Sequence, residues 1–218
     1  MHPRAVRHFS VLMVCALAAG LGGCKSAYYS VWEKLGWAKR DLLVDAVQDA
    51  RKEQVDAQKQ FKTTLQRFQE LTGFSGGDLE AKYKKLNSAY EDSVSQADAV
   101  RTKIKDVDTV ANDLFKEWEK EIGEYENADL KRDSEQKLRD TRKRYEQLFS
   151  AMKNAESRMD PVLRKFKDQV LYLKHNLNAQ AIASLQTTVA GIEGDVSKLI
   201  SEMEASIREA DEFIKQMK

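Results

Sequence analysis

Residues 79–125 read LEAKYKKLNSAYEDSVSQADAVRTKIKDVDTVANDLFKEWEKEIGEY, and this stretch decides the fold class. Apolar residues recur three or four apart along it, covering 46 residues in 13 steps, or about 3.5 residues per step. That period is typical of the apolar seam between supercoiled helices, so the stretch predicts one long helix that packs along its length against others. The apolar positions are Leu79, Tyr83, Leu86, Tyr90, Val94, Ala97, Val100, Ile104, Val107, Ala111, Leu114, Trp118, Ile122 and Tyr125.

Three other stretches carry apolar residues at the same spacing, over residues 43–68, 138–177 and 185–217. No stretch of the sequence shows the strict alternation that indicates strands. Short connections between long helices favour antiparallel neighbours. The sequence therefore predicts an all-α fold, an elongated up-down antiparallel helical bundle or coiled coil of three to four long helices over residues 39–218.

Four short segments set the helix boundaries. Residues 73–77 contain three Gly, which stop a helix, and Asp78 can cap the next one. Residues 126–129 form the next expected turn. Asp160-Pro161 predicts that a helix restarts or kinks there. The third connection is expected at residues 175–178, and a helix continuous through it would leave three helices instead of four.

The first 23 residues are typical of a secretory signal peptide. A basic start with Arg4 and Arg7 precedes thirteen uncharged residues, 9–21. That run is too short to cross a hydrocarbon core of about 30 Å as a helix. Small residues follow it, as expected before a cleavage site. An ordinary cleavable signal or a buried helix is the alternative interpretation.

The end of this segment, Leu21-Gly22-Gly23-Cys24, resembles the bacterial lipobox. The resemblance implies cleavage after Gly23 and attachment of lipid, including a palmitate-type acyl chain, to Cys24. In lipoproteins of this kind, a residue other than Asp after the Cys implies delivery to the outer membrane, and Lys25 stands there. The expected location is the bacterial cell envelope, facing the periplasm. The choice between the inner and the outer membrane stays open.

Residues 24–38 form a lipidated, aromatic, membrane-proximal segment in this interpretation. Tyr28, Tyr29, Trp32 and Trp37 lie within fourteen residues of Cys24. Aromatic rings with a polar edge favour the membrane interface, so these four are candidates for that contact. Packing into the end of the bundle is an equal competitor.

Charge excludes a strongly basic nucleic-acid binder, because 36 Lys and Arg face 35 Asp and Glu. The charges are nevertheless uneven. Residues 106–129 hold nine acidic against two basic side chains, and residues 131–144 hold seven basic against three acidic. The two segments could complement each other across a hairpin. Alternatively, the first binds a cation and the second contacts an anion, lipid or glycan.

An enzyme is not expected. After cleavage, His175 is the one remaining histidine and Cys24 is committed to lipid. The sequence has no H-E-x-x-H motif and no E-x-x-H pair for a bundle metal site. Carboxylate-only chemistry is the route that stays open. No catalytic residue, metal ligand or cofactor is predicted.

Residues 39–45 (KRDLLVD), residues 76–83 (GGDLEAKY) and the stretch 168–185 resemble the bacterial family catalogued as domain of unknown function 2959. The similarity covers nearly all of the chain after the signal peptide. The family has no assigned activity, so the resemblance implies an exported, helical, lipoprotein-like protein and transfers no catalytic residues.

An up-down bundle would place the first and third connections together at the end far from the lipid. Loops on a rigid scaffold often carry binding. The expected function is therefore a non-enzymatic, lipid-anchored scaffold that contacts a periplasmic protein or the cell wall. The alternative is a bundle that carries lipid or another hydrophobic ligand, and self-association through the regular seams stays open. The candidate contact residues are Phe74, Gly76, Gly77, His175, Asn176 and Asn178.

Overall fold

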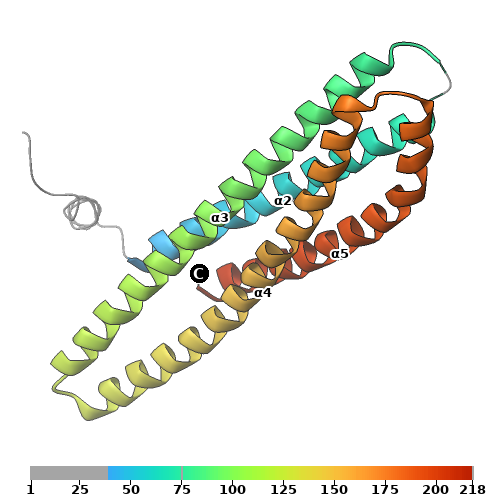
Figure 1. Cartoon of the computed structure of the whole chain (residues 1–218). Helices are drawn as coiled ribbons and strands as arrows, with labels where there is room; N and C mark the ends of the chain where they lie inside the picture. Colours follow the sequence, from blue (N-terminus) through green and yellow to red (C-terminus); the bar gives the residue numbers. More distant parts are fainter. Residues whose placement is uncertain (1–38, 75, 218) are drawn as a thin grey trace, which may run out of the picture. The chain divides into compact units, whose positions relative to one another are not determined.

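The computed structural model describes residues 39–74 and 76–217, and these form four long α-helices with no strand among them. The helices are α2 (Lys39–Thr72), α3 (Leu79–Glu124), α4 (Ala128–His175) and α5 (Ala179–Met217). They run up and down in chain order (Figure 1). The prediction of an elongated antiparallel bundle is confirmed, and the number of helices in the described part is four.

The four helices pack in a closed ring. Helix α2 packs against α3 and α5, and α4 packs against the same two helices. Ion pairs on the surface follow this arrangement: Lys103 of α3 reaches Asp49 of α2 at 2.8 Å, and Lys165 of α4 pairs with Asp195 of α5. These contacts belong to one compact unit, Lys39–Lys218.

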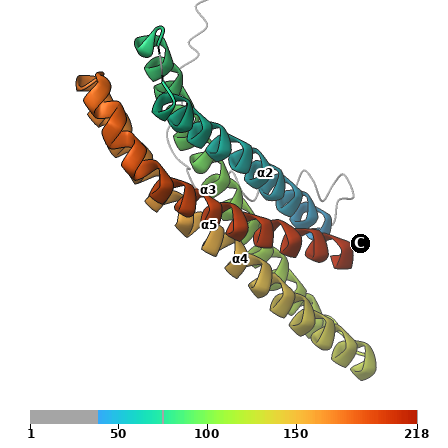
Figure 2. The same ribbon diagram turned by 90° about the vertical axis from the view of Figure 1, so that its right-hand side faces the viewer.

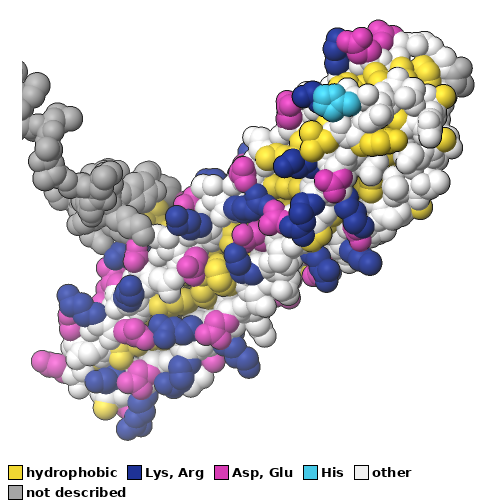
Figure 3. Space-filling model, viewed as in Figure 1, with side chains coloured by type: hydrophobic (Ala, Val, Ile, Leu, Met, Phe, Trp, Pro, Cys, Tyr) yellow, Lys and Arg dark blue, Asp and Glu magenta, His cyan; other side chains and the backbone are white. Residues whose placement is uncertain are grey.

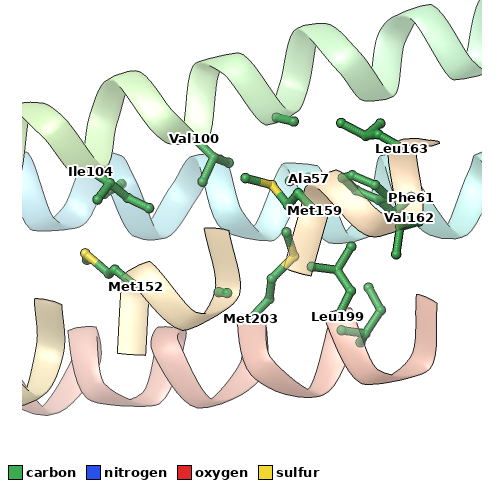
Figure 4. Close-up of a cluster of buried hydrophobic side chains, with 14 of the residues drawn as sticks. Ala57, Phe61, Val100, Ile104, Met152, Met159, Val162, Leu163, Leu199 and Met203 are labelled. Atoms are coloured by element: carbon green, nitrogen blue, oxygen red, sulfur yellow. The ribbon is translucent and has the colours of Figure 1, made fainter. Parts of the chain in front are cut away.

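The core is a continuous column of apolar side chains from all four helices (Figure 4). Phe61, Met159 and Leu199 are fully buried in it. Rings also meet across the bundle, because Phe166 of α4 stacks on Phe68 of α2 with centroids 5.2 Å apart. Burial of this stripe, rather than helix propensity alone, stabilises helices of such length.

Polar side chains occupy a few core positions between α2 and α3. The hydroxyl of Thr64 donates to the carbonyl oxygen of Ala89 at 2.8 Å and lies 2.8 Å from the hydroxyl of Ser93. Gln60 donates to the same carbonyl at 2.9 Å. These hydrogen bonds satisfy the two buried hydroxyl groups inside the apolar seam.

The hairpin of α3 and α4 extends past the ends of the other two helices (Figures 1 and 2). Lys39, at the start of α2, pairs with Glu117 at 2.8 Å, so the last turns of α3 lie beyond α2. We call residues 118–138 the arm. Tyr125 and Leu130 lie at its tip, with 43% and 55% of their surface exposed.

The structure decides between the two alternatives at Asp160-Pro161 and corrects one other sequence prediction. Helix α4 does not restart there; it is continuous from Ala128 to His175 with Pro161 inside it. Proline removes one helix hydrogen bond and crowds the preceding turn, which bends a helix, and α4 changes direction along its length (Figure 1). The apolar seam of residues 79–125 also ends early, because α3 stops at Glu124 and Tyr125 is exposed.

None of the helices in the described part is long and apolar enough to span a membrane.

Candidate functional site

The first and third connections lie at the same end of the bundle, which we call the loop end (Figure 1). A hydrogen bond ties the two hairpins together there, because Gln186 of α5 donates its side-chain N–H to the backbone oxygen of Thr72 at 2.7 Å. Gln69 of α2 also donates to Glu193 of α5 at 2.6 Å. All six predicted contact residues therefore come from one end of the bundle.

The connection after α2 is shaped by two of its three glycines. Gly76 and Gly77 have φ angles of 148° and 105°, a left-handed region that other residues rarely adopt. Asp78 then caps α3 by accepting a hydrogen bond from the backbone N–H of Ala81 at 2.9 Å. Phe74 is half-buried, and the Lys82 ammonium lies 5.5 Å from its ring centroid.

The connection after α4 is built by two asparagines. Asn176 closes α4, with its backbone N–H donating to the oxygens of Tyr172 and Leu173. The Asn178 side chain accepts from the backbone N–H of Ala181 at 3.0 Å, which caps the start of α5. Both asparagines thus have structural roles, whereas His175 is exposed to solvent.

The loop end also carries exposed apolar side chains that were not among the predicted contact residues. Leu171 and Tyr172 of α4 have 48% and 43% of their surface exposed. Figure 3 shows apolar side chains beside the histidine at this end of the molecule. The sequence held a signal for them, because both lie off the buried stripe that includes Val170 and Leu173. Adjacent apolar residues on the outward face of a charged helix suit a protein contact.

Several predicted residues lie outside the described part of the chain, namely Cys24, Tyr28, Tyr29, Trp32 and Trp37. Within residues 39–74 and 76–217, no group of three His, Cys, Asp or Glu side chains could hold a metal ion.

The opposite end has a feature that the sequence did not predict. A hollow of about 310 Å³ lies where the start of α2 and the last turn of α5 meet the base of the arm. Arg40, Lys137 and Arg144 line it together with Asp140, Thr141 and Trp118. The basic segment 131–144 hinted at this site, but Arg40 and Trp118 join it only through the fold.

Contacts between α3 and α4 pair some of the acidic side chains of residues 106–129 with basic side chains of residues 131–144. Arg142 pairs with Glu119 at 3.0 Å and lies 5.0 Å from the ring centroid of Phe115. The Tyr145 hydroxyl donates to the Asp108 carboxylate at 2.8 Å. Burial, and then this hydrogen bond, raises the pKa of Tyr145 far above its ordinary range. Acidic α3 and basic α4 are thus joined by at least one ion pair near the arm.

The described part of the chain is a four-helix bundle with exposed apolar side chains at one end and a partly basic hollow toward the other. A family model described as "Protein of unknown function (DUF2959)" matches residues 28–217, and the chain belongs to that family. The resemblance seen in the sequence is thereby confirmed. A comparison with curated proteins found no match.

Proposed function

We propose that the chain is a non-enzymatic, lipid-anchored protein of the bacterial cell envelope that acts as a helical scaffold. The lipid on Cys24 holds one end of the protein at the membrane. Lys25, directly after it, favours the outer membrane as the destination of the exported chain. The loop end contacts a periplasmic protein or the cell wall.

The observation that carries the contact role is the exposed pair Leu171 and Tyr172 beside the solvent-exposed His175. These side chains stand on a helix that is fixed by a buried stripe on its other face. Helix α2 has 34 residues, or about 50 Å at 1.5 Å per residue, between its start and the loop end. A contact surface at that distance suits a protein that reaches from its anchor to a partner.

The packed column of core residues supports a scaffold more than a carrier. Phe61, Met152 and Met159 are fully buried along the bundle axis. A carrier would need apolar space between the helices, as in a ligand site of some 300–1,000 Å³. The lipid or hydrophobic ligand carrier therefore stays the second candidate, with no specific contact in its favour.

Photo-crosslinking in living cells tests the contact role. A photoreactive residue replaces Tyr172 in one variant and His175 in another, because both side chains are exposed and neither caps a helix. Lys198, exposed in the middle of α5, is the matched control position. Asn178 is avoided since its side chain caps α5.

Both loop-end positions are expected to give adducts with the same envelope protein or with peptidoglycan, and Lys198 to give none. Equal adducts from all three positions, or none from a protein that is abundant and correctly located, would contradict the proposed contact.

A further inference from the structure

We propose that the hollow at the base of the arm binds a phosphate-bearing anion, and that in the anchored protein this anion is a phospholipid headgroup. The assignment of the headgroup rests on the proposed membrane anchoring. The affinity for the phosphate group rests on the hollow alone.

Three basic side chains face one acidic side chain in the hollow. Arg40, Lys137 and Arg144 come from two different helices, so the fold gathers their charges against the single carboxylate of Asp140. Arg144 has no ion-pair partner within the described part of the chain. Guanidinium groups suit phosphate because they can donate two parallel hydrogen bonds to its oxygens.

The other two basic side chains of the hollow have only weak partners within the protein, so they can still bind a ligand. Lys137 pairs with Asp133 at 2.7 Å, but both side chains are more than half exposed, where ion pairs are weak. Arg40 lies 3.7 Å from Asp41, again on an exposed surface. The Asp140 carboxylate accepts a hydrogen bond from Gln136 at 3.0 Å.

The uncharged walls give the hollow a defined shape. The Trp118 indole donates to the hydroxyl of Ser134 at 2.8 Å, which fixes the ring against α4. Thr141 adds a hydroxyl group to the lining. A volume of about 310 Å³ holds a phosphate group with several waters, since one water occupies about 30 Å³ in the liquid.

The position of the hollow suits a membrane ligand. Helix α2 begins at Lys39, fifteen residues after Cys24. Fifteen residues span at most roughly 50 Å when fully extended. A lipid on Cys24 therefore keeps Arg40 within reach of the bilayer surface, where basic side chains bind anionic headgroups. One acyl chain holds a protein only marginally, and a second contact strengthens the anchoring.

Vesicle binding by the chain without residues 1–23 and with Cys24→Ser tests the proposal. This form has no lipid, and the compact unit Lys39–Lys218 contains the whole described core, so the protein folds without the signal segment. One variant carries Lys137→Gln and Arg144→Gln. Its control carries Arg132→Gln and Lys143→Gln, which remove the same charge from the same part of α4 outside the hollow.

We expect binding to vesicles of phosphatidylcholine mixed with phosphatidylglycerol, and much weaker binding to phosphatidylcholine alone. The hollow variant should lose roughly thirtyfold in affinity, as expected for two basic contacts at a membrane surface, while the control changes little. Equal losses in both variants, or no binding to the mixed vesicles and to inorganic phosphate, would overturn the proposal.

A second experiment distinguishes a site for a lipid headgroup from a site for free phosphate. Inorganic phosphate and glycerol phosphate are titrated while the indole N–H signal of Trp118, assigned with Trp118→Phe, is followed by NMR. Saturable shifts that the hollow variant loses indicate a site for the phosphate group itself, whereas binding to vesicles alone indicates a headgroup site. Because this protein carries no lipid, the result is independent of whether Cys24 is lipidated in cells.

Discussion

Gln54 is a buried amide in the apolar seam of α2. Its side chain is fully buried, and neither amide atom has a hydrogen-bond partner in the described part of the chain. The Arg51–Asp211 ion pair and the hydrogen bond from Gln58 to Ile200 set the register of α2 and α5, which puts Gln54 level with Ser206. The Ser206 hydroxyl is likewise buried without a partner among the described residues.

Replacing Gln54 with Met should therefore stabilise the protein. The substitution keeps the length of the side chain and removes two unsatisfied polar atoms, whose burial costs about 1–3 kcal/mol. Urea unfolding measures the free energy of unfolding. The matched control is Gln60→Met, which removes a hydrogen bond to Ala89 and should destabilise. If the Gln54 variant is also destabilised, its amide is hydrogen-bonded in solution.

Tyr145 should make stability depend on alkaline pH. Its pKa in the folded state is raised above the ordinary value of about 10 by burial and by the hydrogen bond to Asp108. Above pH 10 the unfolded chain loses this proton while the folded chain keeps it. The contribution is therefore fully present below pH 10 and falls as the pH rises from there.

Tyr145→Phe should reduce that alkaline loss of stability and cost about 1 kcal/mol at neutral pH through the lost hydrogen bond. Unfolding curves recorded across the alkaline range measure both effects. Some slope should remain, because burial also raises the pKa of Tyr83 and of Tyr90. An identical pH dependence in the variant and the parent would refute this role.

Among single residues, the buried polar side chains of the core were the hardest to predict from the sequence. The sequence pattern treats a polar side chain as outward-facing, yet Thr64, Ser93 and Ser206 are fully buried. Thr64 and Ser93 can be buried because each finds a hydrogen-bond partner on the neighbouring helix. That pairing depends on the register between helices, which periodicity along one helix does not contain.

The start of α3 depends on a single cap. Asp78→Ala removes the carboxylate that accepts from the N–H of Ala81, and loss of such a cap costs about 0.5–2 kcal/mol. Asp78→Asn keeps an oxygen acceptor and should cost less. Thermal unfolding followed by circular dichroism distinguishes the two variants. If both are as stable as the parent protein, the cap contributes nothing.

The presence of the helices was predictable from the sequence, whereas the buried face of each helix was less predictable. In α4, the residues expected in the seam from Leu138 to Met159 are buried. In α5, Ile207 and Ile214 continue the apolar spacing of residues 185–217, which predicts them in the core. They are half-buried, and Ser206 and Phe213 are buried instead. The buried face of α5 is set by two neighbouring helices, so it shifts by one residue where their side chains require it.

The exposed ends of the helices were also hard to foresee. The sequence identifies the turns at residues 73–77 and 175–178, but it does not say that the arm passes the ends of α2 and α5. That difference in length exposes Tyr125 and creates the hollow beside Arg40. The exposed tip of the arm and the hollow at its base therefore both follow from how the helices are staggered.

The whole bundle should unfold as one unit, because its core is continuous. Phe166 is fully buried and stacks on Phe61 and Phe68 across the bundle. Phe166→Ala should lower the free energy of unfolding by about 3–5 kcal/mol, with a smaller loss for the half-buried Phe149→Ala. Tryptophan fluorescence and far-ultraviolet circular dichroism should give coincident transitions. Separate transitions would show that one hairpin unfolds alone.

The proposed function depends on a covalent lipid at Cys24, since the anchor gives the loop end and the hollow their places relative to a membrane. The most direct test is labelling of bacteria with radioactive palmitate, followed by fractionation, for Cys24→Ser and for Cys15→Ser as the control. The control removes the other cysteine, which lies in the segment expected to be cleaved. We predict that the parent and Cys15→Ser are labelled and sediment with the membrane, whereas Cys24→Ser is unlabelled and released. A labelled Cys24→Ser variant, or an unlabelled parent, would contradict the account.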